Sequence, residues 1–315
     1  MATSAAVPRN RMAHWVLRVT ELEKTVEFFK TVFGMVTIRH EENPAACKIT
    51  CNGRFDRPWS KTMMGYQGHT EDKWYCLELT YNYGVRKYDV DNGIRAISIT
   101  TPSDPKTVIE TATKLGYAEG PPQDDGARTI LGPDNYPYVP IQDTAEGTSH
   151  KSEEPFVGVT IVVNDLEASK KFYTEVLDME PVEEAAEGAA NKVVLKYATL
   201  EGTGTSASSR GNTTYLVLEQ KAADAPAIKP SAHSGRLAIS CGDVAGYYKK
   251  FATDKVLHEM QILDEPLGKL EIAIVLDPDN YEICLVTSSV FDPSTKAAAN
   301  WEDPPWEKRR EMGGK

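Results

Sequence analysis

Two hydrophobic patterns alternate along the chain. Short runs in which apolar and polar residues alternate, or which are rich in β-branched and aromatic residues, predict strands at 14–19, 74–81, 94–100, 214–219 and 270–276. Between these runs, apolar residues spaced three or four apart predict helices, the first of them from Leu22 to Phe33. Strands and helices mixed in this order are typical of an α+β fold.

Helix-start signals stand in front of four apolar stretches. Thr20 and Glu23 have the spacing of a capping box, and Gly34 is placed to end the helix that follows them. The other three starts are expected at Asp104 with Pro105, at Asn164 with Glu167, and at Asp243. The first helix therefore begins where the first strand ends.

The two halves of the chain repeat one another. Residues 14–35 align with 158–179 without a gap, so that Phe28 matches Phe172 and Met35 matches Met179. Further on, Gly-x-x-Ala-Ile-Ser occurs in both halves, and so does Pro-Asp-Asn-Tyr; these motifs lie at 93–98 and 235–240, and at 133–136 and 278–281. Each half contains the strand and helix pattern twice, which gives four βαβββ modules.

The repeat and the local composition divide the chain into four parts. We expect a first domain at 11–142, a linker at 143–155, a second domain at 156–288 and a C-terminal tail at 289–315. The linker is almost devoid of large apolar residues. The tail lacks a periodic apolar pattern but contains Trp301 and Trp306, so it is expected either to be flexible or to lie on the body through those two rings.

Charge and hydropathy exclude several classes of partner. The chain has 35 basic and 46 acidic residues, a net charge of −11, which disfavours nucleic acid and anionic membranes. No apolar stretch approaches the roughly 20 residues of a membrane helix, so a soluble protein is expected. The first 18 residues contain three arginines and no acid, as mitochondrial presequences do, but the strand pattern begins near Met12. A cytoplasmic location is therefore expected, with a mitochondrial one as the alternative.

The five cysteines are an odd number in a long chain without a signal-peptide core. This pattern predicts reduced intracellular thiols rather than a disulfide framework. Cys47 and Cys51 are expected to be buried, inert thiols on a strand.

Strand alternation suggests where chemistry could occur. His14 and Arg18 fall on one face of the first strand, and Glu78 and Asn82 fall on one face of another. A histidine and a glutamate that face a β cavity suit Zn²⁺ or Ni²⁺. The alternative is that His14 makes an ordinary hydrogen bond and that Glu78 pairs with Arg18 across the sheet.

At these residues the sequence resembles the vicinal oxygen chelate superfamily, and its glyoxalase I members in particular. The segment His14-Trp-Val-Leu-Arg-Val, with the helix after it, is similar to the family's first-strand motif, and 78–84 is similar to its Glu-Leu-Thr-Tyr-Asn segment. The resemblance implies that His14 and Glu78 are metal ligands, that Arg18 and Asn82 bind glutathione, and that the fold is two tandem glyoxalase-like domains.

The sequence departs from the family at the second pair of ligands. Ile94 and Val139 hold those positions in the first half, and Arg236 and Cys284 hold them in the second. The second half also has Gly158 in place of His14 and keeps only Glu219. We expect the first module of the first half to face the second module of the second half, because this exchange gathers all the polar replacements in one hollow.

Two arrangements of that hollow stay open. His14, Glu78 and a Cys284 thiolate would hold Zn²⁺ with one open position. Alternatively, the Arg236 guanidinium would stand in the metal's place, paired with Glu78, and would contribute to substrate binding.

The resemblance implies isomerisation of the methylglyoxal–glutathione hemithioacetal to S-lactoylglutathione, and so methylglyoxal detoxification. Glutathione would be the co-substrate, a divalent Zn or Ni ion would polarise the substrate oxygens, and Glu78 would be the catalytic base. The alternative is a non-catalytic protein of the same fold that binds glutathione conjugates or a protein partner. An Fe(II) extradiol dioxygenase needs a second histidine ligand that the sequence does not supply.

Overall fold

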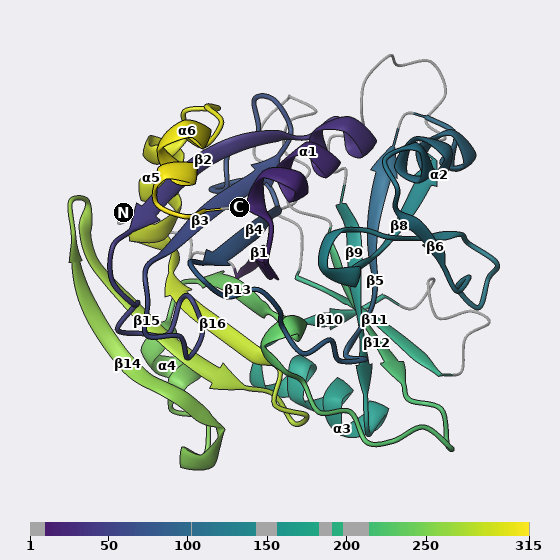
Figure 1. Ribbon diagram of the computed structural model, residues 1–315. Helices are drawn as coiled ribbons and strands as arrows, with labels where there is room; N and C mark the ends of the chain where they lie inside the picture. The colour runs from purple at the N-terminus through teal and green to yellow at the C-terminus, as the bar shows by residue number, and fades with distance from the viewer. Residues whose placement is uncertain (1–9, 102, 143–155, 183–190, 198–213, 315) are drawn as a thin grey trace, which may run out of the picture.

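Two eight-stranded mixed sheets form the body of the protein (Figure 1). The computed structural model describes residues 10–101, 103–142, 156–182, 191–197 and 214–314. The α+β fold with its tandem modules is confirmed. The linker expected at 143–155 lies outside the described residues.

The first sheet has the strand order β14-β15-β16-β13-β1-β4-β3-β2. Its strands are β1 (Arg11–Val19), β2 (Val36–Asn43), β3 (Trp59–Gly65), β4 (Cys76–Asn82), β13 (Arg236–Cys241), β14 (Val256–Glu265), β15 (Gly268–Leu276) and β16 (Glu282–Thr287).

The second sheet has the strand order β10-β11-β12-β9-β5-β8-β7-β6. Its strands are β5 (Ile94–Thr101), β6 (Ala118–Gly120), β7 (Thr129–Leu131), β8 (Pro137–Gln142), β9 (Phe156–Val163), β10 (Glu180–Pro181), β11 (Lys192–Lys196) and β12 (Tyr215–Gln220).

The helices connect the strands within each module, and two more follow the last strand. They are α1 (Leu22–Phe33), α2 (Pro105–Lys114), α3 (Leu166–Lys171), α4 (Val244–Tyr248), α5 (Ser288–Ala298) and α6 (Trp306–Glu311). The shorter turns are η1 (Pro133–Asn135), η2 (Phe172–Val176), η5 (Ala232–Ser234) and η6 (Thr253–Lys255).

Each sheet takes four strands from each half of the chain. In the first sheet β1 lies antiparallel to β13, with Val16 opposite Arg236, and in the second sheet β5 lies antiparallel to β9. The exchanged pairing predicted from the sequence is therefore confirmed. This exchange determines which side chains of the two halves lie on the same face of a sheet.

Alternation along β1 separates the core from that hollow. Trp15, Leu17 and Val19 face a core that includes buried residues of both sheets and of α1 and α2. In this core Phe28 of α1 packs on Tyr138 of the second sheet, with ring centroids 5.3 Å apart. The intervening residues of β1, which include His14, face the opposite side.

The ends of α1 and α3 differ from the prediction. Thr20 does not cap α1; its hydroxyl donates to Asp134 over 2.6 Å. In the second half Asn164 binds Asp279 in the same way, and Asp165 caps α3 instead. The repeated Pro-Asp-Asn-Tyr turn therefore clamps the end of the strand that precedes each helix. The predicted end of α1 at Gly34 is confirmed, and so are the caps of α2 by Asp104 and of α4 by Asp243.

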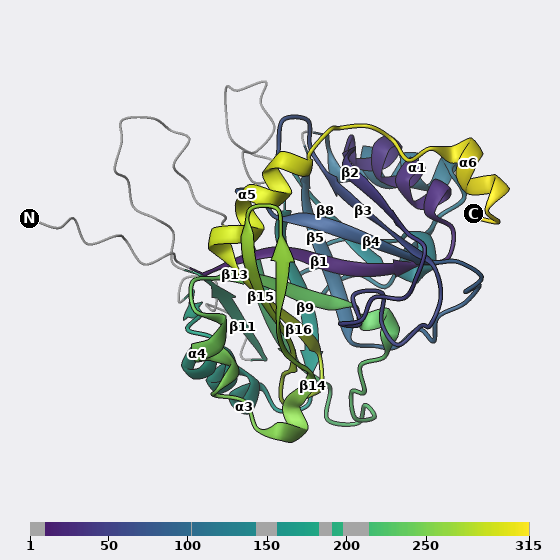
Figure 2. The same cartoon turned by 90° about the vertical axis from the view of Figure 1, so that its left-hand side faces the viewer.

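The tail lies on the body, which was one of its two predicted alternatives. The ribbon of α5 and α6 runs along the first sheet (Figure 2). The backbone N–H groups of Asn300 and Trp301 donate to the carbonyl of Ile38 on the edge strand β2. The anchor further on is Arg309, which is almost fully buried, whereas Trp301 is exposed.

The prediction of five reduced thiols is wrong for one pair. Cys47 and Cys51 form a disulfide in the loop between β2 and β3, where a strand was expected. Cys76, Cys241 and Cys284 are buried thiols that take no part in a disulfide. The disulfide therefore closes a five-residue segment next to Asn52 and Gly53.

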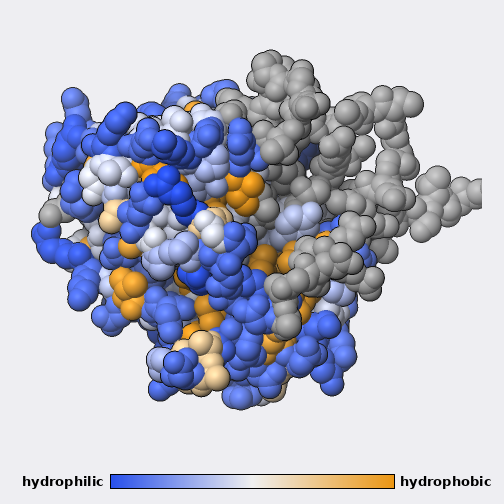
Figure 3. All heavy atoms as spheres, turned by 90° about the vertical axis from the view of Figure 1, so that its right-hand side faces the viewer, coloured by the Kyte–Doolittle hydropathy of each residue, from blue (hydrophilic) through white to orange (hydrophobic). Residues whose placement is uncertain are grey.

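The outer surface gives no sign of a membrane span among the described residues. None of their helices is both long and apolar enough to cross a bilayer. On the face shown in Figure 3, hydrophobic residues occur in small patches among hydrophilic ones.

Candidate functional site

The hollow face of the first sheet brings His14 and Glu78 together. They lie on neighbouring strands β1 and β4, and His14 Nε2 is 3.2 Å from Glu78 Oε2. Both side chains are buried. The pair expected from strand alternation therefore exists as a contact.

A second carboxylate, that of Glu71, contacts the other ring nitrogen of His14. His14 Nδ1 contacts Glu71 Oε1, and Arg39 donates to Glu71 Oε2 over 2.6 Å. Burial alone would raise the pKa of Glu71, but Arg39 and His14 lower it below its usual value. Glu71 is therefore ionised, and its contact with Nδ1 fixes the orientation of the His14 ring.

Lys61 on β3 supplies a positive charge to the other carboxylate. Its Nζ is 3.8 Å from Glu78 Oε2, and the hydroxyl of Thr80 donates to Glu78 Oε1 over 2.7 Å. Despite burial, Lys61 and His14 lower the pKa of Glu78. A carboxylate with a lowered pKa accepts a proton weakly, so Glu78 is a poor general base in this arrangement.

Arg236 does not pair with Glu78. Its guanidinium donates to Glu282 Oε2 over 2.7 to 2.9 Å, and also to the carbonyl of Thr50 over 2.9 Å. The carboxylate of Glu282, on the neighbouring strand β16, therefore holds Arg236 away from His14 and Glu78. This partner was not foreseen.

Cys284 lies on the same face of β16 as Glu282, two residues further on. It packs among apolar residues that include Ala13 and Ile274. Burial raises the pKa of Cys284 to about 11, although Arg236 opposes the rise. In the metal-free protein its side chain is therefore a neutral thiol at physiological pH.

The residues in the hollow do not fit a resident divalent ion. The 3.2 Å between His14 and Glu78 suits two ligands of one ion, since Zn²⁺ bonds of about 2.0 to 2.2 Å place neighbouring ligands roughly 3 Å apart. Catalytic zinc sites use three protein ligands. No group of three His, Cys, Asp or Glu residues suited to a metal occurs in the described part of the chain. Lys61 adds positive charge where a cation would have to bind.

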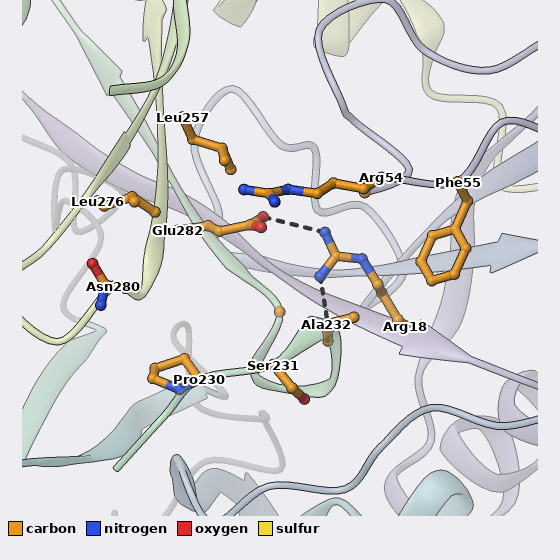
Figure 4. A pocket seen from close by; sticks show the side chains of 12 residues that line it. Arg18, Arg54, Phe55, Pro230, Ser231, Ala232, Leu257, Leu276, Asn280 and Glu282 are labelled. Carbon is orange, nitrogen blue, oxygen red and sulfur yellow. Dashed lines mark hydrogen bonds and ion pairs between the residues drawn. The ribbon is translucent and has the colours of Figure 1, made fainter. Parts of the chain in front are cut away.

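An open cavity of about 340 Å³ lies beside this hollow, at the end of β1 that carries Arg18 (Figure 4). It is lined by Arg18, Gly53, Arg54, Phe55, Pro230, Ser231, Ala232, Gly235, Leu257, Leu276, Asn280 and Glu282. Both halves of the chain contribute to it, so the cavity is a product of the strand exchange.

Arg18 is fully buried at the wall of this cavity. One guanidinium nitrogen donates to the carbonyl of Ala232 over 2.7 Å, and another lies 3.2 Å from Glu282. Its Nε has no hydrogen-bond partner among the described residues. The side chain is held rigidly and keeps its positive charge at the cavity.

Arg54 is the second cation of the cavity. It is exposed, it has no ion pair with any described residue, and it extends across the cavity in the view of Figure 4. Phe55, beside it, gives the cavity an apolar surface. Two guanidinium groups with one carboxylate, Glu282, favour a ligand that is anionic overall.

Asn82 does not line the cavity. Its amide exchanges hydrogen bonds with Asn52 and donates to the hydroxyl of Tyr88 over 3.0 Å. Asn52 lies next to the wall residue Gly53. Asn82 therefore fixes the loop that shapes the cavity and presents no free polar group to a ligand.

The second hollow, on the other sheet, was expected to lack a metal site. Glu219 there is ion-paired with Lys192 over 3.1 Å and with Arg95 over 3.6 Å. The strand register also corrects the repeat alignment. Val217 lies opposite Thr160, and this is the position that Glu78 holds opposite Val16 in the first sheet.

Sequence reasoning missed Glu282, Lys61, Glu71 and Arg54. Glu282 had a signal, because strand alternation places it on the same face as Cys284. Lys61 becomes a neighbour of Glu78 only through the register of β3 on β4, and Glu71 only through the course of a loop. Periodicity contains neither kind of information.

The chain is similar in sequence and in fold to several known proteins. The family model described as Glyoxalase/Bleomycin resistance protein/Dioxygenase superfamily matches residues 156–285. Glyoxalase 1 of Caenorhabditis elegans is 31% identical over 292 residues, which cover 91% of each chain. Glyoxalase domain-containing protein 4 of Mus musculus is 31% identical over 293 residues, or 91% of this chain and 88% of that one. The crystal structure of glyoxalase I from Zea mays shares the fold, with a TM-score of 0.66 and 23% identity over 92% of this chain and 96% of that one.

Proposed function

The chain belongs to the Glyoxalase/Bleomycin resistance protein/Dioxygenase superfamily, and on this premise we propose that it is a glyoxalase-like protein that binds glutathione adducts in the cavity beside Arg18. The adduct of methylglyoxal is the first candidate ligand, because relatives named glyoxalase 1 and lactoylglutathione lyase span most of the chain at about 30% identity. The observation that carries the proposal is the buried Arg18 guanidinium at the cavity wall together with Arg54, which has no ion pair with any residue that the structure describes.

The charges of the cavity complement those of glutathione. A glutathione thioether has two carboxylates and one ammonium group, and the cavity offers two guanidinium groups and one carboxylate. Arg54 would bind a carboxylate, the buried Arg18 would add its positive charge from the cavity wall, and Glu282 would accept the ammonium. The volume of about 340 Å³ is within the usual range for small-molecule sites, about 300 to 1,000 Å³.

Isomerisation of the methylglyoxal hemithioacetal to S-lactoylglutathione is the second candidate function. The names of the relatives and the close approach of His14 to Glu78 favour it. Two observations oppose it: the residues do not fit the metal that the reaction is expected to use, and Lys61 lowers the proton affinity of Glu78. We therefore place binding first.

Calorimetric titration with S-hexylglutathione, a stable thioether, tests the binding proposal. Arg54→Ala should weaken binding by roughly 10-fold, because a hydrogen bond to a charged group contributes about 1.5 to 3 kcal/mol. Arg18→Lys should weaken it at least as much, since a lysine cannot replace the fork of a guanidinium. Arg86→Ala, an exposed arginine outside the cavity lining, is the control and should leave the affinity unchanged. Equal affinity in all four proteins would overturn the proposal.

The two candidate functions are separated by an assay for S-lactoylglutathione. Purified protein is supplied with methylglyoxal and glutathione, with and without added Zn²⁺ or Ni²⁺. We expect no product above the uncatalysed background. Product formation that disappears in Glu78→Gln would establish the isomerase instead.

A further inference from the structure

The His14–Glu78 pair belongs to a row of neighbouring side chains that alternate between basic and acidic residues. From one end to the other, Arg39 pairs with Glu71, Glu71 contacts His14, His14 contacts Glu78, and Glu78 faces Lys61. Glu71 and Glu78 are buried, and each lies next to a basic side chain, Arg39 and Lys61 respectively. Buried carboxylates persist only when paired in this way.

The Lys61 ammonium competes directly with a metal ion for Glu78. Its Nζ is 3.8 Å from Oε2, which is the same oxygen that faces His14. An ion bonded to that oxygen at about 2.1 Å would therefore lie within about 6 Å of the ammonium. At that distance a divalent ion and a lysine repel each other strongly.

The strands on the other side of the hollow do not offset this repulsion. They offer Arg236, which Glu282 and Thr50 hold, and the thiol of Cys284, which is buried among apolar residues. Neither provides the anionic ligand that would balance a second positive charge. This face of the sheet therefore has two of the ligands of a metal site, with the Lys61 ammonium beside them.

We propose that Lys61 takes the place of a divalent cation at the His14–Glu78 pair. An internal ammonium group holds these side chains together, and the pair binds zinc, with water as the remaining ligands, only when that charge is removed. Both ring nitrogens of His14 face a carboxylate oxygen, Nδ1 that of Glu71 and Nε2 that of Glu78.

In the second sheet, too, basic side chains lie next to a carboxylate of low exposure. Its hollow also contains a carboxylate with little exposure, Glu219, and two cations of the chain, Lys192 and Arg95, lie within 4 Å of it. The carboxylate stands at a different register position from Glu78. In both hollows a basic side chain from a neighbouring strand provides the charge that a bound ion would otherwise supply.

Zinc titration of chelator-treated protein tests the inference with the metal alone, independently of any glutathione ligand. The wild type should bind no stoichiometric Zn²⁺ at micromolar concentration. Lys61→Met keeps the length of the side chain but removes its charge, and it should raise the affinity for Zn²⁺ by roughly 100-fold, to about one ion per chain. Adding His14→Ala to that variant should abolish the gain.

The controls separate charge removal from a general change in the protein. Lys87→Met removes an exposed lysine outside this network and should behave as the wild type. Circular dichroism establishes that each variant folds, and Lys61→Gln replaces Lys61→Met if the latter does not. Wild-type protein that binds one Zn²⁺ and loses it in His14→Ala would overturn the inference, and so would a folded Lys61 variant that gains no zinc. Either result leaves the binding of S-hexylglutathione to be judged by its own titration.

Discussion

Asp277 shows how the fold determines the charge state of a single carboxyl group. It lies immediately before the second Pro-Asp-Asn-Tyr motif, and burial raises its pKa to about 7, with a further contribution from Asp279. Its Oδ1 accepts hydrogen bonds from the backbone N–H groups of Asp279 and Tyr281, and Tyr173 donates to Oδ2. These bonds limit the rise but do not cancel it.

Protein stability should therefore fall as the pH rises toward 7. The folded state holds a proton on Asp277 that the unfolded chain, with an ordinary pKa of 3.8, releases. The contribution is complete below about pH 4 and is lost by about pH 7, a change of roughly 4 kcal/mol. Urea unfolding at pH 4 to 8 measures it. Asp277→Asn should flatten the dependence, whereas the exposed control Asp264→Asn should keep it; an unchanged slope in Asp277→Asn would contradict the assignment.

At the same scale, the sequence located some site residues and missed others for one physical reason. His14 and Glu78 were found because alternation within a strand reports which face a residue occupies. Lys61 and Glu71 were missed because their positions depend on inter-strand register and on a loop. Asn82 lies on the expected face, but Asn52 and Tyr88 take up its amide.

Among the elements, the last helix, α6, carries one almost fully buried arginine. Arg309 of α6 lies over the rings of Tyr81 and Tyr83, 5.0 and 5.3 Å from their centroids. Its guanidinium also contacts Glu42 and donates to the hydroxyl of Ser60 over 2.9 Å. The residue that follows, Arg310, makes only an exposed ion pair with Glu23. The hydrophobic pattern could not reveal this anchor, because its buried group is a cation.

Arg309→Ala should therefore release α6 while the sheets stay intact. Losing the charged hydrogen bonds should increase the rate of amide hydrogen exchange in residues 306–311 by roughly 10- to 100-fold. Arg310→Ala is the matched control and should change little, since exposed ion pairs contribute little. Equal protection of α6 in the two variants would show that the anchor lies elsewhere.

Taken as a whole, the molecule places its cavity between the two halves of the chain. Arg18 and Glu282 are 264 positions apart, yet they meet because β1 pairs with β13 and β13 with β16. The repeat in the sequence made this exchange predictable, since only the exchanged pairing collects the polar replacements on one side. It did not reveal that Glu282 would bind both Arg18 and Arg236, because that contact depends on side-chain reach across three strands.

The central claim is that this cavity binds a glutathione adduct without a resident metal. The most direct measurement is a calorimetric titration of S-hexylglutathione into protein stripped of metal, repeated after Zn²⁺ or Ni²⁺ is added. We expect one ligand per chain with the same affinity in both conditions. Binding that occurs only after the metal is restored would contradict the claim.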